Sequence, residues 1–70
     1  MNDKAVKEIL ELKDCMLINH KNWRKGQALF NAIYRIHPEI ANEIRATDID
    51  PFHSDDRIEA CLEFLRNRKE

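Results

Sequence analysis

The sequence predicts an all-α fold: one small domain spanning residues 1–70, a bundle of about four helices, two longer and two shorter, with an acidic loop before the last helix. One Gly and two Pro among 70 residues leave long runs without helix breakers. Apolar residues recur at three- and four-residue spacing, and a hydrophobic share of 43% suffices for a core. A chain this short buries a modest core, so a deep enzymatic cleft is not expected.

The first helix is expected over residues 3–18, with Asp3 as the capping residue. Its apolar positions fall on one face, which predicts an amphipathic helix packed on the core. These positions are Ala5, Val6, Ile9, Leu10, Leu12, Met16 and Leu17. The polar stretch at residues 20–22 then interrupts the pattern and indicates a turn.

The second helix is expected to begin after Asn22, a candidate cap, and to end before Pro38. Its apolar face is predicted to hold Trp23, Leu29, Phe30, Ile33 and Ile36, with Tyr34 beside them. Gly26 is costly inside a helix, by about 1 kcal/mol relative to alanine. Either another segment approaches the backbone closely there, or the glycine sits in the first turn.

The third helix is short and is expected over residues 38–46, "PEIANEIRA". Pro38 suits the first helical turn, and Glu39 lies near the positive end of the helix dipole. Ile40, Ala41 and Ile44 are predicted to face inward.

The fourth helix follows a gap in the apolar pattern and is predicted from "DRIEACLEFLRNR". Ser54, Asp55 or Asp56 can each cap its start, and Asp56 with Glu59 has the spacing of a capping box. Basic residues suit the negative end of its dipole, and they are Arg66, Arg68 and Lys69.

The charge distribution is balanced overall, with a formal net charge of -1, so it gives no global reason to expect nucleic acid or a membrane as a partner. Locally, residues 19–47 carry five Lys or Arg against two acids, and residues 48–70 carry four against seven. These segments can steer a partner or face each other. Cys15 and Cys61 are predicted to be reduced core thiols. Without a signal peptide or a membrane-length apolar run, the protein is expected to be cytoplasmic.

The acidic stretch "RATDIDPFHSDDRIEA", residues 45–60, resembles a calcium loop at its ends only. Phe52 occupies a ligand position, and His53 stands where glycine is needed for the sharp turn. We therefore expect no metal and no cofactor, and a metal-binding loop at residues 48–59 is the less favoured alternative. The preferred reading is a structural connection in which Asp48 and Asp50 bond backbone N–H groups and Phe52 fills the core.

Catalytic residues are not predicted anywhere in the chain. His53 and Ser54 are adjacent, which does not readily bring an imidazole and a hydroxyl together, and no glycine loop offers an oxyanion site. Zinc ligation by Cys15, His20, His53 and Cys61 would lack the paired short spacing of zinc sites. The protein is expected not to be an enzyme.

A polar stripe runs along the second helix at steps of three, four and four residues: Arg24, Gln27, Asn31 and Arg35. Such forked and two-headed groups recognise carboxylates, amides or phosphates. Equally, this face can hold the acidic loop through Arg24 or Arg45. The candidate partner-binding or clasp residues are thus Arg24, Gln27, Asn31, Arg35, Arg45, Asp48, Asp50 and Phe52.

A basic and aromatic cluster precedes and enters the second helix, and its members are Lys21, Trp23, Arg24 and Lys25. Phosphate contacts and stacking by such residues would support nucleic-acid binding, which is the alternative function. Four residues make a small footprint, and Trp23 also suits the core or its rim.

Residues 24–65 resemble small uncharacterised bacterial and phage proteins with the pattern R-x-G-Q-A-hydrophobic-F-N, then P-E-I-A, then I-R-G-T-D-x-D-P-F-Y-x-D-D-x-R-I. Here Ala46 stands where that pattern has glycine, and His53 where it has tyrosine. The resemblance implies no activity. It does imply that the Arg24, Gln27 and Asn31 stripe and the loop of residues 48–52 belong together.

The function expected from these observations is that of a small, non-enzymatic, cytoplasmic protein-binding module. A phage-type host-takeover or anti-defence inhibitor is a special case that the resemblance suggests. A protein partner is expected and a membrane is not, while nucleic acid is the rival partner. The sequence does not specify the oligomeric state.

Overall fold

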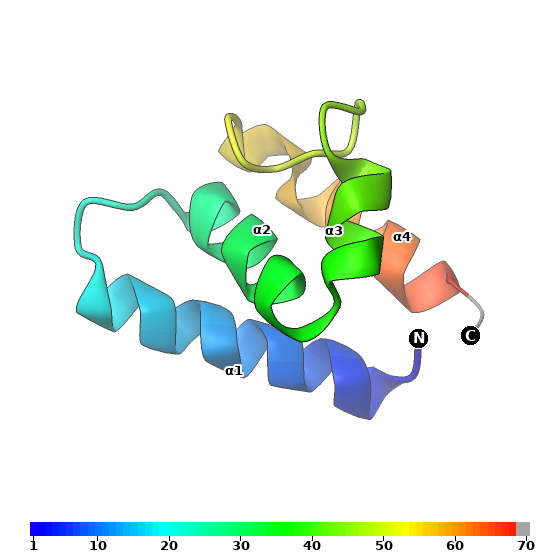
Figure 1. Ribbon diagram of the computed structural model, residues 1–70, viewed down its shortest axis with the longest axis horizontal. Coiled ribbons are helices and arrows are strands. Elements are labelled where there is room, and N and C mark those ends of the chain that lie inside the picture. The colour runs from blue at the N-terminus through cyan, green and yellow to red at the C-terminus, as the bar shows by residue number, and fades with distance from the viewer. Residues whose placement is uncertain (69–70) are drawn as a thin grey trace.

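The computed structural model describes residues 1–68 and confirms the all-α prediction (Figure 1). The helices are α1 (Asp3–Asn19), α2 (Lys25–Ile36), α3 (Pro38–Ile44) and α4 (Ile58–Asn67), with a 3₁₀ turn η1 (Asp55–Arg57) before α4. Residues 1–68 contain no strand. No helix in this part of the chain has both the length and the apolar character needed to cross a membrane. Lys69, expected in the last turn of the final helix, lies outside the described residues.

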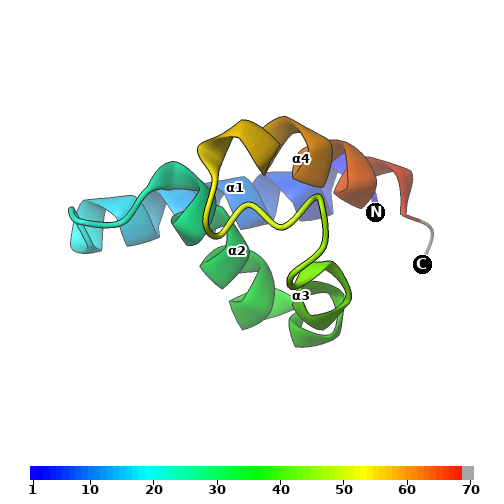
Figure 2. The ribbon, with the colours of Figure 1, turned by 90° about the horizontal axis from the view of Figure 1, so that it is seen from above.

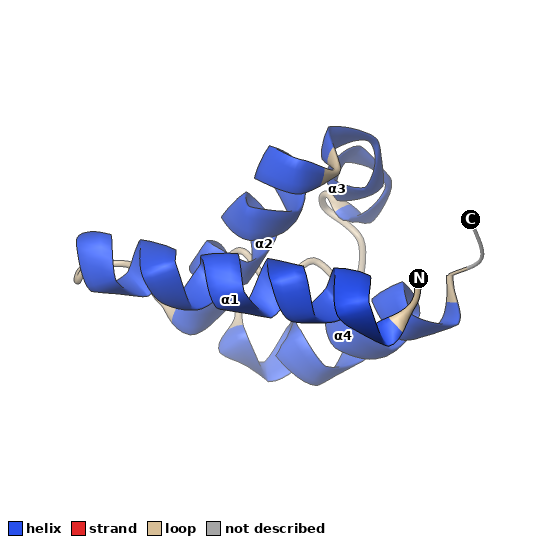
Figure 3. Ribbon diagram, turned by 90° about the horizontal axis from the view of Figure 1, so that it is seen from below, coloured by secondary structure: helices blue, strands red, loops and turns tan. Residues whose placement is uncertain are grey.

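The helices pack around α1 and α2. Contacts join α1 to both α2 and α4, and Figure 3 shows α2 on one side of α1 with α4 on the other. α3 contacts α2, and η1 contacts the start of α2. The segment between α3 and η1, residues 45–54, therefore returns across the N-terminal end of α2, as Figure 2 shows from above.

The core draws on all four helices. Its largest fully buried apolar side chains include Ile9 of α1, Leu29 and Ile33 of α2, Ile44 of α3 and Leu65 of α4. Full burial of one such side chain stabilises the fold by about 1.5–3 kcal/mol. The inward face predicted for α3 is therefore correct, since Ile40, Ala41 and Ile44 are all buried, and α4 buries Cys61, Leu62 and Leu65.

The first helix departs from prediction at its start and in its second half. Asn2, not Asp3, caps it, since the Asn2 side chain accepts a hydrogen bond of 2.8 Å from Ala5 N–H. The predicted apolar face is only half-buried toward its C-terminal end, and Cys15, predicted to lie in the core, is exposed. The reason is the difference in length, because the 17-residue α1 extends past the end of the 12-residue α2.

The second helix begins later than predicted. Arg24, not Asn22, is its N-cap residue, and Trp23 precedes the helix instead of lying on its apolar face. Trp23 is half-buried and its ring stacks on His20, with the centroids 3.9 Å apart. At the other end, Ile36 is exposed although it was expected to face inward. Ala28, Leu29, Phe30, Ala32 and Ile33 form the buried face.

The third helix starts at Pro38 as predicted but ends at Ile44, two residues early. Arg45 is already extended, and Ala46 adopts a left-handed conformation with φ of 61°. A left-handed residue cannot continue a right-handed helix, so the chain turns here into the acidic loop.

The fourth helix begins without the predicted capping box. Its N-cap residue is Arg57, which makes no side-chain capping bond, so Asp56 and Glu59 do not form the reciprocal pair. Neither does Ser54 cap the 3₁₀ turn with its side chain. The third candidate, Asp55, instead accepts a hydrogen bond at the start of α2.

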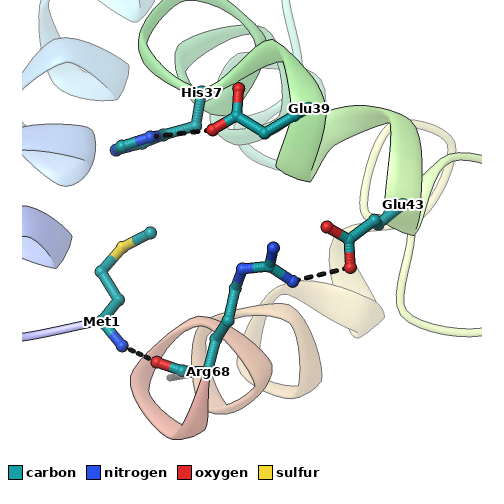
Figure 4. A network of polar contacts seen from close by, with 5 residues as sticks. All are labelled: Met1, His37, Glu39, Glu43 and Arg68. Carbon is teal, nitrogen blue, oxygen red and sulfur yellow. Dashed lines mark hydrogen bonds and ion pairs between the residues drawn. The ribbon is translucent and has the colours of Figure 1, made fainter. Parts of the chain in front are cut away.

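A polar network joins the two ends of the described chain and α3 (Figure 4). The Met1 ammonium group donates to the backbone carbonyl of Arg68, and Arg68 Nη1 lies 2.6 Å from Glu43 Oε1. His37 Nδ1 and Glu39 Oε1 are 3.5 Å apart nearby. Met1 itself is buried among the core residues. This arrangement could not be predicted from local sequence patterns, because it depends on the three-dimensional approach of residues 1 and 68.

Candidate functional site

The acidic loop docks directly on the N-terminal end of α2. Asp55 Oδ1 accepts a hydrogen bond of 2.9 Å from Gly26 N–H, which is one of the free donors at the helix start. The carboxylate also suits the positive end of the helix dipole. A Cβ added at Gly26 would overlap the Pro51 carbonyl oxygen and lie 3.0 Å from Asp55 Oδ1. Gly26 therefore lies in the first turn, and the loop also approaches it closely.

Arg24 makes the second contact between α2 and the loop. Its Nη2 donates to the Phe52 carbonyl oxygen at 2.8 Å, so the predicted contact through Arg24 is present. Gln27 supports this end of the helix, since its Oε1 accepts a longer bond of 3.4 Å from Arg24 N–H. Within the loop, Arg57 Nη1 donates to the Thr47 carbonyl oxygen at 3.3 Å.

Asp50 organises the loop from inside. Its side chain is 7% exposed, and its two oxygens accept hydrogen bonds from Ala46 N–H at 2.7 Å and Phe52 N–H at 2.9 Å. Charge-assisted bonds of this kind are the stronger ones in proteins. The same role was predicted for Asp48, but Asp48 is exposed and accepts no hydrogen bond from the described residues. Thr47 takes part instead, donating to Ile44 O at 2.6 Å.

The structure also shows where it places the residues of the two metal-site alternatives, a calcium loop and a zinc site. Both oxygens of Asp50 point to backbone donors, and Asp55 points to Gly26. Over residues 1–68 no group of three or more His, Cys, Asp or Glu side chains is placed to hold a metal ion. Cys61 is fully buried, and its burial, reinforced by the nearby Asp50 carboxylate, raises the pKa of its thiol to about 12. Such a thiol is protonated and chemically inert at neutral pH.

A surface pocket of about 400 Å³ opens between α2 and the loop. We call it the aromatic pocket, because four of its lining side chains carry aromatic rings. It is lined by Phe30, Asn31, Tyr34, Arg45, Asp50, Phe52 and His53. The first three lie on one face of α2 at positions i, i+1 and i+4, and the other four come from the end of α3 and the loop.

The rings form the pocket's walls. Phe52 meets Phe30 edge to face, with centroids 5.6 Å apart, and meets His53 in a similar way at 4.9 Å. Phe30 is 6% exposed and Phe52 is half-buried, so these two also pack on the core. Tyr34, in contrast, is 48% exposed.

Arg45 lies at the pocket with its guanidinium carbon 5.6 Å from the Phe30 ring centroid and 5.8 Å from that of Tyr34. Cations favour this position over aromatic faces. No described residue accepts a hydrogen bond from the Arg45 guanidinium, and the Asn31 amide and the Tyr34 hydroxyl likewise make no hydrogen bond within residues 1–68. Three polar groups at the aromatic pocket thus make no hydrogen bond within residues 1–68 and can bond to a molecule bound there.

The structure divides the predicted candidate residues into three groups. Asn31, Arg45, Asp50 and Phe52 line the pocket, whereas Arg24 and Gln27 act at the junction of loop and helix. Arg35 and Asp48 are exposed and line no part of the pocket.

Sequence reasoning did not identify three of the lining residues as part of a site, namely Phe30, Tyr34 and His53. A signal existed for two of them, since Phe30 and Tyr34 flank Asn31 on the same helical face. His53 joins them only through the fold of the loop.

The basic and aromatic cluster lies in and just after the α1–α2 connection. Lys21 and Lys25 are exposed, and one face of the half-buried Trp23 ring is covered by His20 with the two planes 7° apart. The Arg24 guanidinium is engaged by the Phe52 carbonyl. This leaves two lysines and a partly covered indole for contact with a nucleic acid.

No known protein family, curated protein or solved structure matches the chain. The geometry described above is therefore the basis on which a function is proposed.

Proposed function

We propose that this chain is a small, non-enzymatic protein-binding module of the cytoplasm and that it binds its partner at the aromatic pocket. The observation that carries the proposal is the set of unused hydrogen-bonding groups on the pocket wall, from Asn31, Tyr34 and Arg45. Aromatic residues and arginine are enriched where protein partners bind most strongly. Aromatic rings also supply contact area at low entropic cost.

The anchoring of the pocket supports the same proposal. Asp50 and Asp55 hold the loop by hydrogen bonds to backbone N–H groups, and Arg24 holds it from α2. A wall fixed in this way loses little freedom when a partner binds, which favours affinity. On this view the clasp residues position the site, and the pocket residues contact the partner.

The biological setting of the proposal rests on the resemblance to bacterial and phage proteins. A phage-type inhibitor of a host protein, active in takeover or against defence, would act by covering part of its target. A pocket whose loop wall is held by several hydrogen bonds suits such a role.

The test is affinity capture from lysate of the natural host, with and without nuclease, using three baits: the unchanged protein, a Tyr34→Ala variant and an Arg35→Ala control. Both changed side chains are exposed and lie next to each other on α2, but only Tyr34 lines the pocket. We expect one stoichiometric protein that survives nuclease and is lost with Tyr34→Ala only. Equal recovery on all three baits would contradict binding at the pocket.

Nucleic-acid binding is the second candidate, favoured by the exposed Lys21 and Lys25 on either side of the stacked Trp23. It predicts that the bait recovers nucleic acid that is lost at moderate salt. Replacing Lys21 and Lys25 by Glu should abolish that recovery while leaving capture of a protein at the pocket unchanged.

A further inference from the structure

We infer that the aromatic pocket recognises an acidic segment of a partner protein, in which a neutral apolar side chain enters the pocket and a neighbouring carboxylate pairs with Arg45. This inference rests on the proposed function and specifies the chemistry of the partner.

The interior of the pocket selects a neutral group. Asp50 lies there at 7% exposure, and both of its oxygens are already bonded to backbone N–H groups. A second carboxylate beside it would meet like-charge repulsion and lose its hydration. Phe30 and Phe52 offer apolar surface at the same place, so an aliphatic or aromatic side chain is the group that fits.

The exposed charge of the pocket selects an anion. Arg45 is exposed, and its guanidinium is supported by the Phe30 and Tyr34 rings without a hydrogen bond to any described residue. A planar guanidinium presents a fixed fork of donors that matches a carboxylate in bidentate fashion. Because the rings restrain the side chain, less rotamer freedom is lost when a carboxylate pairs with it.

The remaining polar groups suit a peptide backbone. The Asn31 amide offers both a donor and an acceptor, and the Tyr34 hydroxyl offers the same. Peptide groups of a bound segment present N–H and C=O groups in pairs and can use both side chains. A volume of about 400 Å³ lies at the small end of ligand pockets, so it accommodates one large side chain.

A nucleic acid fits this pocket less well. A phosphate backbone is bound by several basic side chains in a row, whereas Arg45 is the one Lys or Arg among the residues that line this pocket, and Asp50 adds a carboxylate to the same lining. The favoured occupant is therefore a protein segment with an anchor residue and an adjacent acid.

The experiment is selection from a displayed random peptide library on the full-length protein, and the Arg45→Ala variant enters only in the later binding measurements. Enriched peptides are synthesised with a fluorescent label, and their dissociation constants are measured by anisotropy. We expect Asp or Glu next to an aromatic or aliphatic residue in these peptides. Arg45→Ala should weaken binding at least about tenfold through loss of the pair with the carboxylate, whereas the control Arg35→Ala should change it less than about twofold.

Three outcomes would overturn the inference, and they separate it from the proposed function. Basic or uncharged peptides that lose binding with Tyr34→Ala would reject the acidic chemistry but keep the pocket as a protein-binding site. Peptides indifferent to both Tyr34→Ala and Arg45→Ala, or no enrichment at all, would reject both proposals. Displacement of a bound peptide by single-stranded oligothymidylate would reject the protein segment in favour of nucleic acid. Far-UV circular dichroism of each variant verifies folding.

Discussion

Gly26→Ala tests how closely the acidic loop approaches α2. The substitution removes a helix-destabilising glycine, which contributes at most about 1 kcal/mol in favour of the variant. Against this, the new Cβ would overlap the Pro51 carbonyl oxygen and press on Asp55 Oδ1, so the loop must move away. Overpacking costs about 1–3 kcal/mol. Losing the bond between Asp55 and Gly26 N–H costs about 1.5–3 kcal/mol more.

The expected net effect is a loss of about 1.5–5 kcal/mol in the free energy of unfolding, a large part of the stability of a small domain. Urea denaturation followed by far-UV circular dichroism and by Trp23 fluorescence measures it. A double-mutant cycle with Asp55→Ala locates the cause. If the new methyl group has already displaced the loop, Asp55→Ala should cost less in the Gly26→Ala background than alone.

The reference variant is Arg35→Ala, which changes an exposed position of the same helix and should alter stability by less than about 0.5 kcal/mol. A Gly26→Ala protein as stable as the unchanged one, or more stable, would refute the reasoning. In that case helix propensity would dominate, and the loop would not lie against the backbone of α2.

Four further predictions concern the loop and the cysteines. Asp50→Ala should lower the free energy of unfolding, as measured by urea denaturation, by about 2–4 kcal/mol, because it leaves two backbone N–H groups without acceptors. Asp50→Asn should lower it less. Ala46→Gly should raise it by about 1 kcal/mol, since φ is 61° there, and a lower melting temperature would contradict this. An alkylating reagent should modify Cys15 quickly and Cys61 only on unfolding. The pKa of the Cys61 thiol is about 12 in the fold and 9.0 in the unfolded chain, so the unfolded chain loses this proton first. The free energy of unfolding should therefore fall between pH 9 and 12, by at most about 1.4 kcal/mol per pH unit. Cys61→Ala should remove this slope.

The sequence sufficed to predict the helices because their signal is local. Apolar residues at three- and four-residue spacing identify α2 and α4 without knowledge of their neighbours, and Pro38 marks the boundary between α2 and α3. Helix starts were less predictable, since the acceptor at the start of α2 is Asp55, 29 residues further along the chain. Local sequence rules place Asp55 at the start of α4, which it precedes, and do not reveal its hydrogen bond at the start of α2.

The candidate site was predicted in part for a related reason. The polar stripe indicated Asn31, and the loop indicated Asp50 and Phe52, because each pattern is visible in a few consecutive residues. Their meeting with Tyr34 and His53 depends on a turn at Ala46. Glycine is expected at that position from the sequence pattern that the chain resembles, and glycine suits a positive φ. The presence of alanine there is visible in the sequence, but the left-handed turn that it adopts is visible only in the backbone conformation.

The polar link between Met1 and Arg68 brings the two ends of the described chain together. The same packing of helices could therefore be kept with a different order of helices along the chain. A circular permutant that joins these two residues through a short linker and opens the chain at residues 21–22 should keep every helix–helix contact. Both positions of the new opening are exposed, as tolerated breakpoints usually are. The linker peptide supplies an N–H donor where the ammonium group now stands. New chain ends would then lie beside Trp23, at positions that do not line the aromatic pocket, so they offer a place to attach a tag.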